Sequence, residues 1–313
     1  MDVYEQIIAS FSTLPQLHQW DQALTLMQRV GARKPYHWLL PVRACAAVGG
    51  TAEQGIAAAL AVACCHLSII LVDDMLDDDP RGEYRQMGMA AAANLSSAFQ
   101  AAASAAVEGC PAPANRRLAA LTSLNEMMLT TSLGQYWDVQ SPADEDGYWR
   151  VVQTKSSPFF GTALELGALL GGGSARAARQ LKALGALYGE MVQIHDDLND
   201  SMLIPANADW LQGRFSLPIL FARSVPHPAR ARFMQLCADV NDPQALAEAQ
   251  EILIGCGAVS YCVEQLLDRY ASMQTVLKAT PLRVRGEMQS LAQEVIAPVW
   301  KLFAELDGSC EVA

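Results

Sequence analysis

One stretch of the sequence, residues 69–79, restricts the possible folds and functions of the chain more than any other. It joins a strongly apolar run, Ile69 to Val72, to five aspartates within seven positions, namely Asp73, Asp74, Asp77, Asp78 and Asp79. So many like charges at the end of an apolar segment are unfavourable unless a cation lies among them. Hard carboxylate oxygens in this number suit Mg²⁺ better than zinc or copper. The stretch therefore predicts an apolar helix whose end binds Mg²⁺.

A second copy of the pattern Asp-Asp-x-x-Asp lies at Asp196, Asp197 and Asp200, again on an apolar, helix-like background. In each copy the first and last aspartates are four residues apart, so they lie on one face of a helix, one turn from each other. Two facing helices that present such pairs would form a cage for several Mg²⁺ ions, with positions left for phosphate oxygens. A solvated acidic helix end or a structural Ca²⁺ site would explain one copy, but the second copy argues against both.

The sequence predicts an all-α fold, because apolar residues recur at helical spacing over long windows while Gly and Pro lie mostly at breaks. Alanine and leucine are abundant, aromatic residues make up 7%, and no Gly-rich or Ser-rich linker divides the chain. We therefore expect one helical domain over residues 1–313. Local signals predict three helix starts: the capping box Thr51-x-x-Gln54, Asp242-Pro243 and Thr280-Pro281.

The charge and the termini limit the partners and the location of the protein. A net charge of −11 argues against nucleic acid or an anionic membrane surface as a partner, because both require a positive field. The N-terminus lacks the basic start and apolar core of a signal peptide, and no apolar run reaches the roughly 18 to 20 residues of a spanning helix. The eight cysteines form no C-x-x-C pair, which is typical of core residues in a reducing compartment. We therefore expect a cytoplasmic protein without a stable membrane anchor.

Both aspartate motifs and the residues between them resemble the trans-isoprenyl diphosphate synthases, which include the farnesyl and geranylgeranyl diphosphate synthases, over about residues 30–225. The intervening landmarks follow the order typical of that family: Lys34, His66 seven residues before Asp73, Arg81-Gly82, Gly134-Gln135 with Asp138, Lys155-Ser156, Gln193, and Gly213-Arg214-x-Ser216-Leu217-Pro218. The resemblance implies a single-domain helical bundle of the isoprenoid synthase type around a deep central cavity. It also implies a homodimer.

By resemblance, the chain is expected to be a Mg²⁺-dependent prenyltransferase that condenses an allylic prenyl diphosphate with isopentenyl diphosphate. Six aspartates would bind the metal, with three ions around the bound diphosphate: Asp73, Asp74, Asp77, Asp196, Asp197 and Asp200. The residues implied in catalysis are Asp73, Asp77 and Asp196 together with Lys155 and Arg214, the two cations at the allylic diphosphate. This division is physically sensible, because a diphosphate needs positive donors whereas a carbocation needs a dry, unreactive wall.

The remaining substrate-binding residues are also implied by the resemblance. Isopentenyl diphosphate would lie against Lys34, His37, His66 and Arg81, while Ser156 and Gln193 would contact substrate beside the second motif. Ser68 and Ile69 stand five and four positions before the first aspartate, where bulky aromatic residues limit chain growth in the family. Their smaller side chains favour a product of C20 or longer.

The departures from the family pattern lie mainly on the acceptor side. His37 replaces an arginine, so a permanent charge becomes a group that is mostly neutral at pH 7. Further replacements are Pro80 for arginine, Arg214 for lysine, Asn94 for aspartate and Val192 for phenylalanine. Two alternatives to elongation stay open. The first keeps the ionisation of the diphosphate but makes the chain a terpene synthase-like lyase or cyclase, or a prenyltransferase to a different acceptor. The second, ranked lower, is a non-catalytic subunit. Elongation ranks first, because the second motif is not the Asn-Asp-x-x-Ser-x-x-x-Glu of usual cyclases and no core aspartate is lost.

Overall fold

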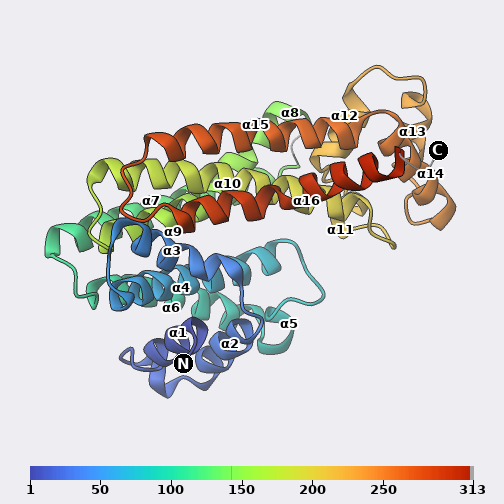
Figure 1. Cartoon of the computed structure of the whole chain (residues 1–313). Helices are drawn as coiled ribbons and strands as arrows, with labels where there is room; N and C mark the ends of the chain where they lie inside the picture. Colours follow the sequence, from blue (N-terminus) through green and yellow to red (C-terminus); the bar gives the residue numbers. More distant parts are fainter. Residues whose placement is uncertain (142, 311–313) are drawn as a thin grey trace. The chain divides into compact units, whose positions relative to one another are not determined.

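Every regular element in residues 1–141 and 143–310, the part of the chain that the computed structural model describes, is helical (Figure 1). This confirms the all-α prediction. The chain forms two compact units, the first made of residues 1–131, 158–186 and 276–290, and the second of residues 132–157, 187–275 and the described residues from 291 onward. The prediction of a single domain over residues 1–313 stays a prediction.

The helices of the first unit come mainly from the N-terminal half of the chain. They are α1 (Val3–Ser12), η1 (Leu17–Gln19), α2 (Asp21–Ala32), η2 (Tyr36–Leu39), α3 (Leu40–Val48), α4 (Ala52–Leu76), α5 (Tyr84–Met87), α6 (Met89–Glu108) and almost all of α9 (Ser157–Leu170). The second unit contains α8 (Glu145–Val151), the π-helical turn η3 (Val152–Ser156), α11 (Ala208–Leu211), α12 (Leu217–Ser224), α13 (Arg230–Leu236) and α14 (Pro243–Gly255). Four longer helices contribute residues to both units: α7 (Ala114–Asp138), α10 (Ala175–Ser201), α15 (Ala258–Ala279) and α16 (Gly286–Cys310).

Helix α4 carries the first aspartate motif at its C-terminal end and packs against α1, α3 and α6 (Figure 1). Its capping box is confirmed, because the Thr51 N–H donates to Gln54 Oε1 over 2.9 Å and the Gln54 N–H donates to Thr51 Oγ1 over 3.3 Å. Small buried side chains let the neighbouring helices approach α4 closely, and they include Ala58, Ala59, Ala61, Ala63, Cys64 and Cys65. The motif therefore stands at the end of a helix that is fixed by packing on several sides.

The expectation that no apolar run could span a membrane was wrong for α4. By length and composition this helix could cross a bilayer, and the bent pair α14–α15 would also qualify if it is counted as one span. However, 67% of the apolar window in α4 is buried, as in the core helix of a soluble protein, so one such helix is weak evidence for a membrane span. The apolar character of α4 follows from its position among other helices.

The two other predicted helix starts differ in outcome. Helix α14 begins as predicted, with Asp242 accepting the Ala245 N–H and Pro243 in the first turn. The start at Thr280-Pro281 is wrong, because α16 begins at Gly286. In the intervening segment, Arg285 donates to the carbonyls of Leu277 and Thr280 at the end of α15, so the side chain caps the preceding helix.

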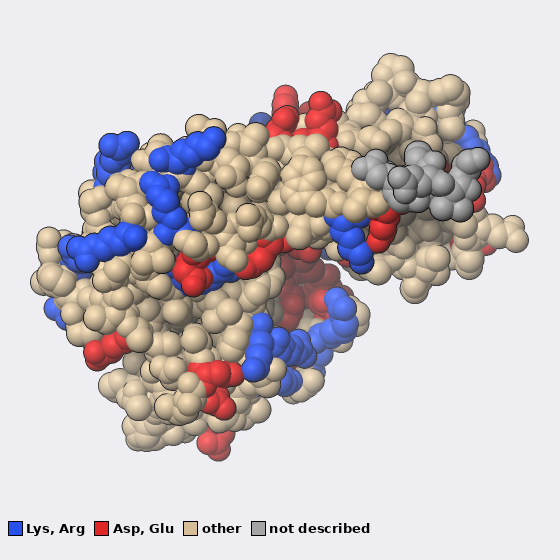
Figure 2. Space-filling view, in the orientation of Figure 1, with Lys and Arg blue, Asp and Glu red and all other residues tan. Residues whose placement is uncertain are grey.

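Charged side chains form separate small groups on the face drawn in Figure 2, where most of the surface is uncharged. No continuous basic patch is visible on that face, in line with the net charge of −11. The seven cysteines whose side chains are described are free thiols, and five of them are buried: Cys45, Cys64, Cys65, Cys110 and Cys262.

Candidate active site

The second aspartate motif lies in the last two turns of α10, within the second unit. Asp196 and Asp200 are one helical turn apart, as the spacing predicts. Burial raises the pKa of Asp196 to about 6, and the negative charges of Asp200 and Asp197 act in the same direction. Carboxylates crowded in this way repel one another, so a cation bound between them would lower their free energy.

Asp197 differs from its neighbours because its side chain is buried and hydrogen-bonded within the protein. Only 6% of the residue is exposed. Its Oδ2 accepts the backbone N–H of Leu217 over 2.8 Å, and its Oδ1 accepts from Nε2 of Gln193 over 2.9 Å. Burial raises the pKa of Asp197 to about 6, although these two hydrogen bonds act in the opposite direction. Both carboxylate oxygens of Asp197 thus already have partners inside the second unit.

Lys155 lies in the π-helical turn η3, a type of turn that is rare and often found at functional sites. Its Nζ donates to Asp138 Oδ2 over 2.5 Å, so two landmarks of the sequence pattern form an ion pair. Gly134 allows this approach, because a Cβ atom added there would lie 2.4 Å from the backbone nitrogen of Lys155. The next residue, Ser156, donates its hydroxyl to Oε1 of Gln193 over 3.0 Å.

Arg214 lies in the turn between α11 and α12. Gly213 adopts a φ of +77°, a left-handed conformation that suits glycine. The Arg214 guanidinium donates to Gln212 Oε1 over 2.6 Å and pairs with Asp209 Oδ1 over 3.0 Å. Three residues later, Leu217 begins α12 and binds Asp197. Within the second unit, a chain of hydrogen bonds therefore runs from Ser156 through Gln193 and Asp197 to Leu217. Lys155 directly precedes the first residue of this chain, and Arg214 lies three residues before the last.

The first aspartate motif lies in the first unit, where α4 ends. The Asp77 N–H donates to the Asp73 carbonyl over 2.9 Å, which confirms that these two residues are one helical turn apart. Asp74 accepts the Glu83 N–H over 3.3 Å, and burial raises the pKa of Asp74 to about 6. The aspartates that follow belong to the loop, since Asp78 accepts from Tyr84 and Arg85, and Asp79 pairs with Arg81. The arrangement of the two motifs across one cavity stays a prediction.

His37 and His66 lie against each other in an aromatic cluster of the first unit. Their ring centroids are 4.1 Å apart, and the Phe159 ring is 5.5 Å from His37 and 5.9 Å from His66. Trp38 Nε1 donates to His66 Nδ1 over 3.2 Å, while His37 Nε2 is buried with no hydrogen-bond partner in the described part of the chain. Burial lowers the pKa of His37 to about 4 and places that of His66 well below its ordinary value. Both imidazoles are therefore neutral at pH 7.

The two predicted acceptor-side cations are paired with acids near the surface. Lys34 Nζ lies 2.9 Å from Asp2 Oδ2, and Arg81 lies 3.1 Å from Asp79 Oδ2. Trp38 and Phe159 complete the histidine cluster, and sequence reasoning missed both as site residues. The aromatic group around His37 was a signal for Trp38, whereas Phe159 is distant in the sequence and gave no such signal.

The role of Ser68 on the cavity wall stays a prediction. Ser68 is fully buried, and its hydroxyl lies 2.9 Å from the hydroxyl of Ser96 on α6. The two small hydroxyls satisfy each other where α4 and α6 pack together. Its neighbour Ile69 is half-buried on α4.

In the described residues, no three His, Cys, Asp or Glu side chains lie close enough together to hold a metal ion by themselves. The donor types nevertheless fit Mg²⁺, because each motif presents hard carboxylate oxygens one helical turn apart. A Mg²⁺ ion at either motif would need further oxygen ligands from water or from a diphosphate. This is the ligand arrangement that Mg²⁺ commonly has at phosphate-binding sites.

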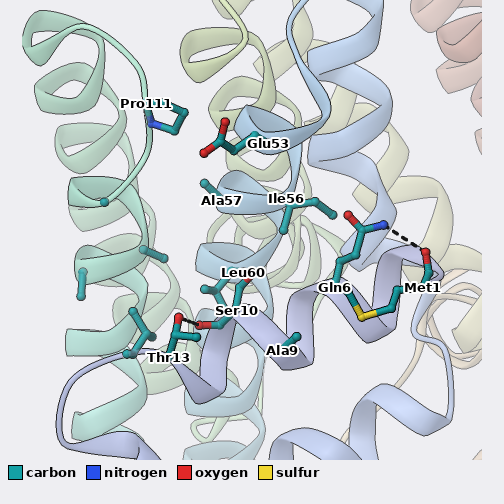
Figure 3. Close-up of a pocket in the computed structure, with 14 residues that line it drawn as sticks. Met1, Gln6, Ala9, Ser10, Thr13, Glu53, Ile56, Ala57, Leu60 and Pro111 are labelled. Atoms are coloured by element: carbon teal, nitrogen blue, oxygen red, sulfur yellow. Dashed lines mark hydrogen bonds between the residues drawn. The ribbon is translucent and has the colours of Figure 1, made fainter.

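A pocket of about 550 Å³ in the first unit is lined by none of the predicted site residues (Figure 3). Its walls come from α1, the first part of α4 and the end of α6, and they include Leu60, Ala57 and Glu53. It lacks the paired cations and carboxylates that a metal-bound diphosphate requires. We therefore do not place the active site there.

Comparison with known proteins identifies the family. Residues 33–254 match the polyprenyl synthetase family. A short chain isoprenyl diphosphate synthase of Methanothermobacter thermautotrophicus is 27% identical over 240 residues, which cover 71% of this chain and 73% of that protein. The octaprenyl diphosphate synthase of Escherichia coli is 23% identical over 277 residues, which cover 81% of this chain and 83% of that protein. The fold is similar to that of a geranylgeranyl pyrophosphate synthetase from Pyrococcus horikoshii, with a TM-score of 0.82 and 18% identity over 93% of this chain and 95% of that one. Since the matched residues include both aspartate motifs and most of the chain, the protein belongs to the polyprenyl synthetase family.

Proposed function

We propose that this protein is a trans-prenyltransferase that condenses an allylic prenyl diphosphate with isopentenyl diphosphate to give a longer trans-prenyl diphosphate. The observation that carries the proposal is the chain of hydrogen bonds from Ser156 through Gln193 and Asp197 to Leu217, whose two ends lie next to Lys155 and close in sequence to Arg214. Two cations and a carboxylate pair in one unit suit a metal-bound diphosphate. The named relatives, all of them prenyl diphosphate synthases, support the same activity.

Lys155 and Arg214 would bind the allylic diphosphate, the lysine as a point charge and the arginine as a planar fork of donors. Bound Mg²⁺, with three ions as our proposed number, would supply the positive charge that makes the diphosphate a better leaving group. The carbon–oxygen bond at C1 then breaks, and its electrons leave with the diphosphate. The double bond of isopentenyl diphosphate attacks the resulting cation, a carbon–carbon bond forms, and the departing diphosphate takes up the proton that is lost.

The acceptor diphosphate would lie at Lys34, Arg81 and the two histidines. Lys34 and Arg81 are the charged groups of this set, because His37 and His66 are neutral at pH 7. We propose a product of C20 or longer, because position 69 holds an isoleucine and not a bulky aromatic residue that would limit the length of the prenyl chain.

A homodimer in the cytoplasm completes the proposal. In the first unit, helix α7 exposes two large apolar side chains, Leu118 and Leu129, which lie on one face of the helix. A second copy of the chain would cover this face. Light scattering coupled to gel filtration should give twice the chain mass for the wild type and a lower mass for Leu129→Glu; a wild-type monomer would exclude the dimer.

The decisive experiment is incubation of the purified protein and Mg²⁺ with geranyl, farnesyl or geranylgeranyl diphosphate, with and without isopentenyl diphosphate. Elongation gives a longer diphosphate only when isopentenyl diphosphate is present. Asp73→Ala and Asp196→Ala should abolish the activity, because metal-assisted departure of the diphosphate requires both motifs. Wild-type turnover in both variants would contradict the proposed metal site.

A second candidate function keeps the ionisation step and changes the acceptor. The neutral cluster of His37, His66 and Phe159 favours it, because an uncharged aromatic wall suits a cyclising cation or an apolar acceptor. Hydrocarbon or alcohol formed without isopentenyl diphosphate would establish this alternative over elongation.

A further inference from the structure

Asp197 stands in the middle of the second motif, but its surroundings differ from those of a carboxylate directed at a ligand. Its two oxygens accept hydrogen bonds from different parts of the second unit, Oδ1 from Gln193 and Oδ2 from Leu217. Its own carbonyl accepts the Ser201 hydroxyl over 2.6 Å, and that hydroxyl lies 2.9 Å from the hydroxyl of Ser216. The side chain of Asp197 thus binds the first residue of α12 directly, and its main chain connects to Ser216 through the Ser201 hydroxyl.

The start of α12 explains why this interaction matters. The first backbone N–H groups of a helix have no partner within the helix, and a side chain at the residue before it usually accepts one of them. Ser216 occupies that position but makes no such capping bond. The Asp197 carboxylate accepts the Leu217 N–H instead, from another helix. A negative charge at a helix N-terminus is also favourable for the helix dipole.

We propose that Asp197 is a positioning residue that fixes the Arg214 turn and the Lys155-Ser156 turn against the second motif, and that it does so as the cap of α12. The inference rests on the proposed function, because it takes Arg214 and Lys155 as the groups that bind the allylic diphosphate. Gln193 completes the connection, since it donates to Asp197 and accepts from Ser156. Asp196 and Asp200 then remain as the carboxylates of this motif that hold metal.

The first motif contains a corresponding interaction. Asp74, the second aspartate of that motif, accepts the backbone N–H of Glu83 in the loop that carries Arg81. In both motifs, therefore, the second aspartate binds the main chain of the segment that follows and carries a cation. The recurrence supports a common division of labour in which the second aspartate positions a loop.

Hydrogen–deuterium exchange of the full-length protein without Mg²⁺ or substrate tests the capping role directly. Asp197→Asn should speed exchange of the Leu217 amide and its neighbours in α12 by roughly ten- to hundredfold, because a charge-assisted hydrogen bond is lost. Asp196→Asn should leave these amides unchanged. Asp242→Asn is the matched control, because Asp242 also accepts a backbone N–H at a helix start in this unit. Wild-type exchange in Asp197→Asn would overturn the inference, and Ser201→Ala tests the same segment if Asp197→Asn does not fold.

Kinetics separate positioning from metal binding. Asp197→Asn should raise the KM for the allylic diphosphate about tenfold and leave the Mg²⁺ concentration for half-maximal rate within about twofold of wild type. Asp196→Asn should instead raise that Mg²⁺ concentration. A parallel rise in both variants would make Asp197 a metal ligand and refute its positioning role. If the wild type itself shows no elongation, the proposed function fails, while the exchange experiment still decides whether Asp197 caps α12.

Discussion

Replacement of His37 by phenylalanine should make the protein more resistant to mild acid than the wild type. His37 lies in the cluster formed by His66, Phe159, Phe160 and Tyr36, where burial lowers its pKa from 6.5 to about 4. His66 and Tyr36 are the titratable groups among these ring neighbours, and no charged side chain appears among the ring contacts described for His37. An unfolded chain binds a proton at His37 near pH 6.5, whereas the folded chain does not until about pH 4. Stability contributed by this site is therefore complete above pH 6.5 and is lost as the pH falls towards 4.

The expected size of the effect follows from the two pKa values. Between pH 7.5 and pH 5.5, the wild type should lose about 1.3 kcal/mol of unfolding free energy at His37, which His37→Phe cannot lose. The raised pKa values of Asp74 and Asp196 act in the opposite direction, because the folded chain then holds protons that the unfolded chain releases as the pH rises. The total pH dependence of the wild type therefore mixes both signs. Comparing wild type and variant at each pH cancels the aspartate contributions.

Urea unfolding followed by circular dichroism at pH 7.5 and pH 5.5 measures this difference. Phe159→Leu is the matched control, because it removes a ring of the same cluster without removing a titrating group. Its loss of stability should be the same at both pH values. The reasoning is refuted if the free-energy difference between wild type and His37→Phe is also the same at both pH values.

Three further predictions follow from single contacts. Gly134→Ala should lower kcat and reduce the free energy of unfolding by about 1–3 kcal/mol, because the added Cβ would lie 2.4 Å from the Lys155 backbone nitrogen. A variant with the kcat and Tm of the wild type would contradict the close approach of α7 and η3. Ser68→Phe should destabilise the fold by about 1–3 kcal/mol through overpacking against Ser96, as seen by thermal unfolding. An unchanged Tm with a shorter product by mass spectrometry would contradict overpacking and support the predicted place of Ser68 on the cavity wall. Chelation with EDTA should abolish elongation and added Mg²⁺ should restore it, whereas full activity in EDTA would exclude a metal-dependent site.

The fold could be predicted from the sequence wherever a helix carries its own start signal. Thr51 and Gln54 cap α4 reciprocally, and Asp242 caps α14, because all the partners lie within three residues of one another. The signal at Thr280 failed for a non-local reason. The backbone N–H groups of Arg283 and Val284 donate to the Ala47 carbonyl at the end of α3, over 2.9 and 3.0 Å, so they do not form helical hydrogen bonds to residues 279 and 280. Local propensity gives way where a distant part of the chain satisfies the backbone.

The candidate site shows the same limit. Motif spacing placed Lys155 and Asp138 among the site landmarks, and the structure joins them in an ion pair. Motif spacing could not show that Asp197 would bind the start of α12, because the partner is the backbone N–H of Leu217 and carries no sequence signature. The charge state of His37 was also only half predictable. The sequence showed that His37 replaces an arginine of the family pattern. It could not show the lowered pKa of His37, because that depends on burial against His66 of α4 and Phe159 of α9.

The predicted isopentenyl diphosphate site differs from the family pattern, but its residues can still bind a diphosphate. This follows from the free energy that each residue would lose or gain when the diphosphate binds. Lys34 and Arg81 are paired with Asp2 and Asp79 near the surface, and exposed ion pairs contribute little to stability, so a diphosphate can replace the carboxylates with little loss of free energy. Protonating the buried His37 or His66 would require more free energy than breaking these exposed ion pairs, because burial disfavours the charged imidazole. The indole N–H of Trp38 can only donate a hydrogen bond, so Nδ1 of His66 must accept it. The single proton of the neutral His66 ring therefore lies on Nε2, and this N–H is an uncharged hydrogen-bond donor. The chain therefore can offer an acceptor diphosphate two cations and one neutral donor, and the loss of arginine at position 37 should weaken acceptor binding without abolishing it.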